Sequence, residues 1–127
     1  MPNTTFIVGQ DYSRRQIHEQ LGGSLQSYLP TVDGAVVCAC LRPDLNRRAP
    51  EVILVGFGSG IQRAGDMLIR QTAPIPVFIK RVSGCWTYRG GWSVGRRSQL
   101  PADIEQESGV TRRGTVSWVI FMERADR

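Results

Sequence analysis

The nine residues 84–92, GCWTYRGGW, place three large aromatic side chains and three glycines directly after the apolar run PVFIK of residues 76–80. Glycine gives the backbone access to positive φ angles, and each aromatic ring carries a large apolar surface. Two apolar runs separated by a glycine-rich turn are typical of a β-hairpin. The stretch therefore predicts a hairpin whose aromatic side chains either fill a small β core or belong to a binding surface.

The sequence on both sides of this hairpin predicts a mixed α+β domain. A first helix is expected after Ser13, because Gln16 completes a capping box and Gly22 and Gly23 end the apolar stripe. A second helix is expected over residues 61–71. Together, about six strands and two flanking helices favour a curled sheet or barrel. Five of the strands are expected at residues 35–41, 51–57, 75–82, 92–97 and 115–125, with a short helical segment at 100–106.

The length and composition bound the class of protein. The 127 residues predict a single domain, residues 1–127, and 41% apolar with 21% charged residues is typical of a soluble globular protein. No apolar run approaches the roughly 20 residues of a membrane helix, and the N-terminus lacks the pattern of a secretory signal. We therefore expect a cytoplasmic protein with no membrane partner.

The positive charge is carried almost entirely by arginine. The formal net charge is +5, and Lys80 is the sole lysine. Guanidinium groups bind phosphate bidentately and stack on bases, so clustered arginines are typical of a nucleic-acid-binding surface. The alternative is that arginine serves only solubility. Arginine pairs occur at 14–15, 47–48, 96–97 and 112–113.

The sequence offers no recognisable catalytic, metal or cofactor motif. Cys38, Cys40 and Cys85 lack the spacing of a zinc site, so buried reduced thiols are favoured over metal or disulfide. His18 has no nucleophile at a recognisable spacing, and the acidic residues are scattered. The glycines of GFGSG, residues 56–60, match neither a dinucleotide-binding nor a Walker loop. We therefore expect no catalytic residue, no metal and no cofactor.

Five segments follow one another along most of the chain: VGQDYSRRQIHEQLGGS, GAVVCACLRPD, VILVGFGSG, YRGGWSV and VSWVIFMERAD. Taken in order, they resemble the SRA (SET- and RING-associated, or YDG) domain, a reader of modified cytosine in DNA. The sequence is most similar to SRA-like domains of bacterial methylation-dependent restriction endonucleases. The resemblance implies a PUA-like β barrel that flips a modified base out of the duplex into a pocket.

The resemblance also implies site residues. Asp44 stands where the family's aspartate accepts a hydrogen bond from the cytosine amino group, and Gly56 stands at the glycine that ends a pocket strand. Leu41 and Leu54 replace the tyrosines that stack on the base in that family, and Val55 replaces its pocket threonine. Phe57, Trp86 or Tyr88 is then expected to supply an aromatic ring. The predicted pocket thus contains Leu41, Asp44, Leu54, Val55, Gly56, Phe57 and Tyr88.

Two further sets of residues are expected to contact DNA. The loop GGSLQSYLP corresponds to the segment that enters a groove, with Ser24, Gln26, Ser27 and Tyr28 as its inserting residues. Arg89 takes the place of the signature aspartate, and the finger after the glycine turn is short, with only Gln62 and Arg63. The arginines expected to contact the DNA backbone are Arg14, Arg15, Arg47, Arg48, Arg63, Arg96 and Arg97.

The leading hypothesis is a non-catalytic module that recognises double-stranded DNA carrying 5-methylcytosine or a related base. A fused or associated nuclease would place it in bacterial defence by restriction. Three alternatives stay open at this level: an RNA-binding PUA-like domain of the ASCH or YTH type, a small PUA-like hydrolase, and a plain interaction domain.

Overall fold

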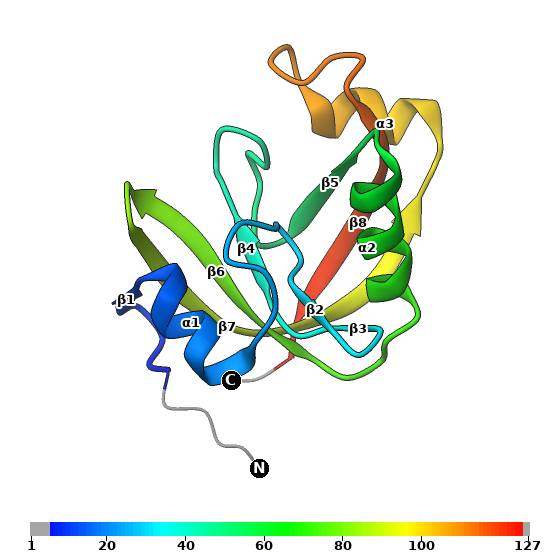
Figure 1. The fold of residues 1–127 in the computed structure, drawn as a ribbon. Helices are drawn as coiled ribbons and strands as arrows, with labels where there is room; N and C mark the ends of the chain where they lie inside the picture. Colours follow the sequence, from blue (N-terminus) through cyan, green and yellow to red (C-terminus); the bar gives the residue numbers. More distant parts are fainter. Residues whose placement is uncertain (1–5, 126–127) are drawn as a thin grey trace.

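A six-stranded sheet organises the protein, whose computed structural model describes residues 6–125 (Figure 1). The strand order is β4-β6-β7-β8-β5, with β1 paired to β7 beside this path, and the β4–β6 pair is parallel. A two-stranded β2-β3 ladder lies apart from it. The strands are β1 (Asp11–Tyr12), β2 (Thr31–Val32), β3 (Ala35–Val36), β4 (Ala39–Leu41), β5 (Val52–Gly56), β6 (Ile75–Val82), β7 (Cys85–Ser98) and β8 (Val116–Arg124). The helices are α1 (Arg14–Leu21), α2 (Ser59–Ile69) and α3 (Pro101–Ser108).

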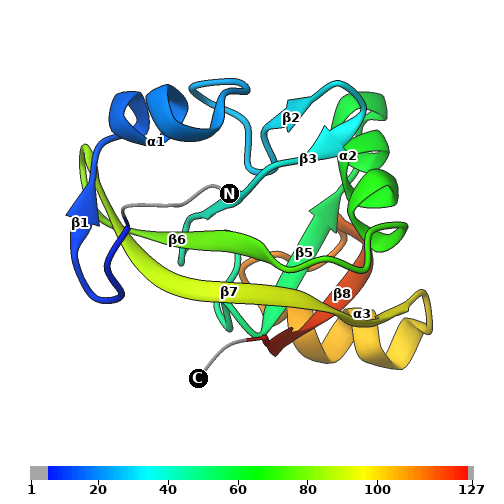
Figure 2. The same ribbon diagram turned by 90° about the horizontal axis from the view of Figure 1, so that it is seen from below.

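The predicted hairpin exists, but its turn lies earlier than the sequence suggested. β6 and β7 pair through Val82 and Cys85, so the turn is formed by Ser83 and Gly84, and Gly84 has a φ of +78°. The expected return strand at 92–97 is instead the second half of β7. The first half of β7 pairs with β6 and the second half with β8, which lets one long strand join both parts of the sheet (Figure 2).

The aromatic side chains of the hairpin fill the core. Trp86 and Tyr88 are buried with Phe78 and with Ile17 of α1, whereas Trp92 belongs to the main core cluster. Gly90 has a φ of +93°, and a Cβ there would lie 3.1 Å from the Arg124 guanidinium. This glycine therefore meets two demands, a left-handed backbone and close packing.

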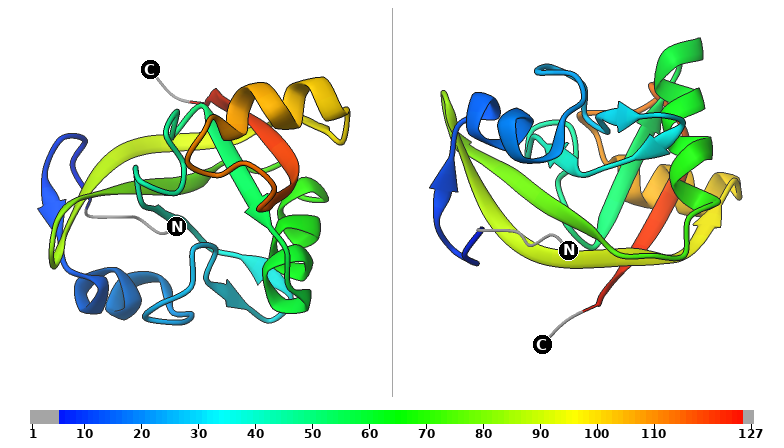
Figure 3. Two further views of the ribbon diagram at one scale, coloured as in Figure 1. Left: turned by 90° about the horizontal axis from the view of Figure 1, so that it is seen from above. Right: turned by 60° about the horizontal axis from the view of Figure 1, so that its bottom comes forward.

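The helices lie on opposite sides of the sheet. α1, the β2-β3 ladder and α2 lie on one side, and α3 covers the outer face of β5 and β8 (Figure 3). Alternation along β5 explains both contacts: Ile53 and Val55 enter the main core, while Val52 and Leu54 join Ile104 of α3 in a separate cluster. The sequence indicated α3 only as a short helical segment.

The sequence signals for the start and end of α1 are confirmed. The second predicted helix is present as α2, but with a different start. Ser13 and Gln16 form the capping box of α1, which ends at Gly22. α2 begins at Ser59, two residues before the predicted start. Among residues 6–125, no helix has the length and apolar character needed to cross a membrane.

The sheet remains open between β4 and β5, the two ends of the strand order, so no closed barrel forms. The expected strand at 35–41 is also divided, because β3 and β4 are separated by Val37 and Cys38. The Val37 N–H donates to the Pro30 carbonyl, and the Cys40 N–H donates to the Tyr28 carbonyl. Residues 28–30 therefore run along the free edge of β4.

Candidate nucleic-acid interface

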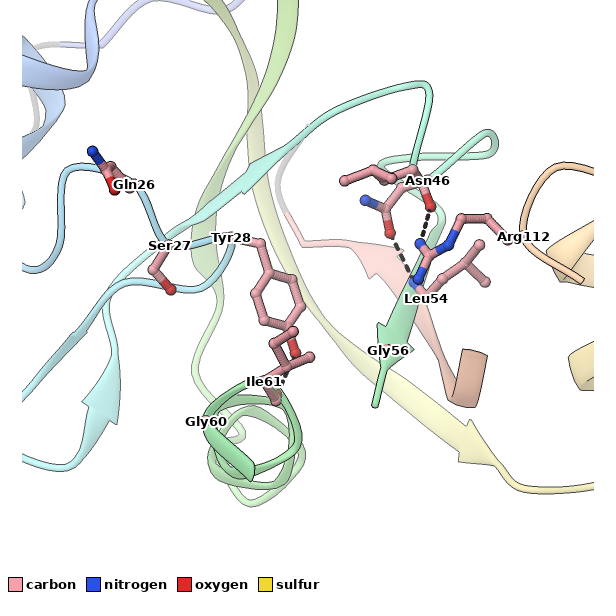
Figure 4. A pocket seen from close by; sticks show the side chains of 10 residues that line it. Gln26, Ser27, Tyr28, Asn46, Leu54, Gly56, Gly60, Ile61 and Arg112 are labelled. Atoms are coloured by element: carbon pink, nitrogen blue, oxygen red, sulfur yellow. Dashed lines mark hydrogen bonds between the residues drawn. The ribbon is translucent and has the colours of Figure 1, made fainter. Parts of the chain in front are cut away.

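A cleft of about 500 Å³ lies at the open side of the sheet (Figure 4). One wall comes from the loop after α1 and the first turns of α2, and the other comes from β5 and the loops at residues 42–50 and 109–115. Its volume falls within the usual range of small-ligand sites. The lining residues are Gln26, Ser27, Tyr28, Leu45, Asn46, Leu54, Gly56, Gly60, Ile61 and Arg112.

Tyr28 joins the two segments that make the first wall. Its hydroxyl donates a 2.6 Å hydrogen bond to the Ile61 carbonyl of α2 (Figure 4), and its ring packs against the main core. Burial raises the pKa of the Tyr28 hydroxyl above its usual range, so the group stays protonated and donates. The loop after α1 is thereby fixed to α2.

Asn46 holds the opposite wall. Asn46 is 4% exposed, and its Oδ1 accepts a 2.8 Å hydrogen bond from the Leu54 backbone N–H (Figure 4). β5 is an edge strand paired only with β8, so this amide takes the place of a neighbouring strand for Leu54. The loop at residues 42–50 is thereby anchored to β5.

Arg112 lines the cleft next to Gly56 and provides its positive charge. Its Nη1 donates to the Leu45 carbonyl at 2.6 Å, and its Nε donates to Thr115 Oγ1 at 2.9 Å. A Cβ at Gly56 would lie 3.3 Å from Arg112 Nη2, so the glycine allows the guanidinium to approach β5 closely. Burial lowers the pKa of Arg112 from its ordinary value, and nearby Asp44 opposes this change.

The loop expected to enter a DNA groove is held in a defined shape. Ser24 Oγ accepts hydrogen bonds from the N–H groups of Gln26 and Ser27, at 3.0 and 3.1 Å. Arg14 Nη2 donates to the carbonyls of Ser24 and Ser27. Gln26, Ser27 and Tyr28 line the cleft, and Ser24 supports them from outside it.

The structure brings only two of the seven predicted pocket residues, Leu54 and Gly56, into the cleft. Leu41 and Val55 are fully buried in the main core, and Tyr88 packs on Phe78 with ring centroids 5.1 Å apart. Phe57 directly follows Gly56 but is 60% exposed, outside the lining set.

Asp44 lines an adjoining cavity of about 200 Å³, which shares Leu54 and Arg112 with the cleft. Arg42 pairs with its carboxylate through two hydrogen bonds of 2.7 and 3.2 Å, and 59% of the Asp44 side chain is exposed. The hydrogen bond from Arg42 lowers the pKa of Asp44, so the carboxylate is charged at neutral pH. Asp44 therefore lies beside the cleft as an ion-paired acceptor.

Of the seven arginines predicted to contact DNA, Arg14 binds the loop after α1, and the other six fall into two groups. Arg47 donates to the carbonyls of Gln106 and Glu107 in α3, and Arg48 binds both carboxylate oxygens of Glu107, at 2.8 and 3.0 Å. Arg96 and Arg97 stack on Phe121 and Trp118. By contrast, Arg15 and Arg63 are exposed, and their side chains make no hydrogen bond or ion pair within residues 6–125.

Five residues complete the cleft without having been predicted as site residues: Leu45, Asn46, Gly60, Ile61 and Arg112. Arg112 belongs to a noted arginine pair, which was the only sequence signal for it. Cys38 and Cys40 are buried, Cys85 is half-buried, and all three are unbridged. Within residues 6–125, no group of three or more His, Cys, Asp or Glu side chains is placed to hold a metal ion.

Comparisons with known proteins identify the fold. No protein-family model and no curated protein matches the sequence. Among solved structures, the SRA domain of SUVH5 in a hemimethylated CG DNA complex superposes with a TM-score of 0.68 at 13% identity, covering 99% of this chain and 93% of that one. The same domain with fully methylated CG DNA gives a TM-score of 0.65 at 14% identity and the same coverage.

A second likeness is to ScoMcrA, a type IV phosphorothioation-dependent restriction endonuclease. It gives a TM-score of 0.53 at 15% identity and covers 91% of this chain but only 27% of that one. The class of fold is therefore that of SRA domains. The resemblance seen in the sequence is confirmed for the fold, as an open curled sheet with three helices.

Proposed function

We propose that this chain is a DNA-binding module that recognises a modified base, 5-methylcytosine or a relative, in double-stranded DNA. The observation that carries the proposal is the cleft between Tyr28 and Asn46 in a domain with the SRA fold. The net charge of +5 and the exposed Arg15 and Arg63 support a polyanionic partner. The solved SUVH5 domain was crystallised with methylated DNA, which favours the same class of ligand here.

The side chains of the cleft suit a flipped base. Leu45 and Ile61 offer exposed apolar surface for a methyl group, and Tyr28 adds an aromatic ring to one wall. Arg112 supplies donors for a ring carbonyl or nitrogen, and the Asp44 carboxylate in the adjoining cavity is the candidate acceptor for an exocyclic amine. Extruding a base costs a few kcal/mol, which contacts to its faces and pairing edge offset.

The role of the module is recognition, and we assign no catalytic residue to it. The likeness to part of ScoMcrA supports a place in restriction of modified DNA, with cleavage carried out by a fused or associated nuclease domain. We expect duplex DNA incubated with the chain and Mg²⁺, Mn²⁺ or Zn²⁺ to remain intact, with every base unchanged by mass analysis.

The decisive experiment measures affinity for a duplex with one 5-methylcytosine, the same unmodified duplex, and an RNA of the same sequence. Arg112→Gln should lower affinity for the modified duplex by one to two decades, since a base-edge contact contributes about 1–3 kcal/mol of discrimination. Arg113→Gln is the matched control, because Arg113 carries the same charge at the next position but does not line the cleft.

A second variant separates loss of the site from damage to the fold. Ile61 is 42% exposed on the cleft wall, so Ile61→Trp should fill the space without deleting a buried contact. We expect the preference for modified DNA to disappear while the melting temperature stays near wild type. Unchanged preference in a well-folded Ile61→Trp protein would contradict the assignment of the cleft, and tighter binding to RNA would favour the RNA-binding class.

A further inference from the structure

Besides the cavity that Asp44 lines, another cavity, of about 330 Å³, adjoins the cleft and has a different chemical character. It shares Gln26, Tyr28, Leu45 and Asn46 with the cleft, so the two spaces have a common wall. Its remaining lining includes three cationic side chains from three separate segments: Arg14 of α1, Arg42 after β4, and Lys80 of β6. Of the residues expected around the base, Trp86, a candidate for the aromatic ring, lines this cavity.

Two of these cations face one aromatic ring. The Arg14 guanidinium carbon lies 5.2 Å from the Trp86 ring centroid, and Lys80 Nζ lies 5.9 Å from it. Two like charges brought to one ring repel each other, and partial burial strengthens the repulsion. An anion bound between them would offset that cost.

The described residues 6–125 supply little counter-charge to these two cations. Asp44 attracts Lys80, which helps to lower the pKa of the Asp44 carboxyl, but Arg42 takes up both carboxylate oxygens. Within residues 6–125, neither Arg14 nor Lys80 forms an ion pair, and Lys80 Nζ makes no hydrogen bond. Arg14 uses Nη2 for the loop carbonyls, which leaves Nη1 and Nε for another acceptor.

We propose that this basic cavity is a phosphate subsite, in which Arg14 and Lys80 bind a backbone phosphate of the strand that delivers its base to the adjoining cleft. The inference rests on the proposed function, since it assumes that the cleft takes a base. The common wall suits a nucleotide, whose base and phosphate need an apolar and a cationic space close together. Lys80, the sole lysine, thus acquires a binding role.

The test combines Lys80→Gln with duplexes that carry one neutral methylphosphonate linkage at successive positions around the 5-methylcytosine. For wild type, one linkage should lower affinity about tenfold, because the neutral group cannot accept a charge-assisted hydrogen bond. Lys80→Gln should bind the all-phosphate duplex about tenfold more weakly and show no further weakening at that linkage. Arg89→Gln is the control: Arg89 is exposed, lies outside this cavity, and should give additive effects.

The outcomes separate this inference from the proposed function. If wild type prefers the modified duplex, but every methylphosphonate linkage weakens wild type and Lys80→Gln equally, the phosphate subsite is refuted and the base cleft stands. If wild type shows no preference for the modified duplex, the base cleft fails, whatever Lys80 does. Inorganic phosphate as competitor completes the test: weakening by millimolar phosphate in wild type but not in Lys80→Gln supports the subsite, and equal weakening contradicts it.

Discussion

The role of Asp44 depends on its neighbours in space as well as on its position in the sequence. It follows β4 by three positions, where the sequence suggested a base contact, and the structure pairs it with Arg42 at the edge of an adjoining cavity. A carboxylate held this way is still an acceptor on its free side. The two roles, turn residue and base contact, therefore predict different effects of substitution.

We expect Asp44→Asn to lower affinity for modified duplex toward that for unmodified duplex. The change keeps the size of the side chain but removes the charge and one acceptor oxygen, and such contacts are worth about 1–3 kcal/mol. Binding titrations on both duplexes, together with melting temperatures, measure the effect. Equal weakening on both duplexes with a lowered melting temperature would assign Asp44 to the turn, and unchanged preference would remove it from the site.

Gly65 is the second residue whose role becomes clear only in three dimensions. It interrupts a predicted helix, yet a Cβ there would lie 3.1 Å from Trp118 Cζ2 and 3.1 Å from Val55 Cγ2. Val55 is fully buried and Trp118 is 5% exposed, so neither can move aside easily. The glycine permits α2 to pack closely on β5 and β8.

Gly65→Ala should therefore destabilise the protein, by about 1 kcal/mol in urea unfolding. Overpacking costs about 1–3 kcal/mol, and the gain in helix propensity returns up to about 1 kcal/mol. Gly60→Ala is the matched control in the same helix, because nothing lies within 4 Å of its Cβ position. That variant should be neutral or stabilised, and a stabilised Gly65→Ala would show that α2 can shift outward.

At the scale of elements, α3 accounts for arginines that the sequence assigned to DNA. Arg47 bonds two carbonyls in the last turn of α3, and Arg48 neutralises Glu107, which is 5% exposed. Removing the partner of a buried carboxylate leaves a charge without compensation. This arginine pair therefore fixes α3 to the loop that carries Asn46, and any phosphate contact it makes is additional.

The salt dependence of DNA binding should distinguish these arginines. Arg15→Ala with Arg63→Ala should flatten the slope of log K against log salt by about 0.9 for each phosphate that is no longer neutralised, without changing the melting temperature. Arg47→Ala with Arg48→Ala should instead lower the melting temperature, because α3 loses its anchor. Titration across salt, with thermal unfolding of both double variants, measures this. If Arg47→Ala with Arg48→Ala instead left the melting temperature unchanged and flattened the salt slope, both arginines would be assigned to the DNA-binding surface.

Over the whole molecule, the sequence predicted best those features whose interacting residues lie close together along the chain. The capping box of α1 and the β6–β7 hairpin are encoded within a few residues of each other, and both are confirmed. The cleft brings together Tyr28, Asn46, Ile61 and Arg112, which lie too far apart in the sequence for helix or strand periodicity to connect them. Likewise, nothing near Arg47 in the sequence indicates that its partners are carbonyls some sixty residues later.

The opening between β4 and β5 has a consequence for self-association. Free strand edges invite another chain to add a strand, which leads to aggregation. Here the Leu54 N–H on one edge is occupied by Asn46, and the Cys40 N–H on the other by the Tyr28 carbonyl. The groups that line the gap thus satisfy backbone donors on both edges. The open sheet is thereby protected, at these positions, against fibril-like pairing with its own copies.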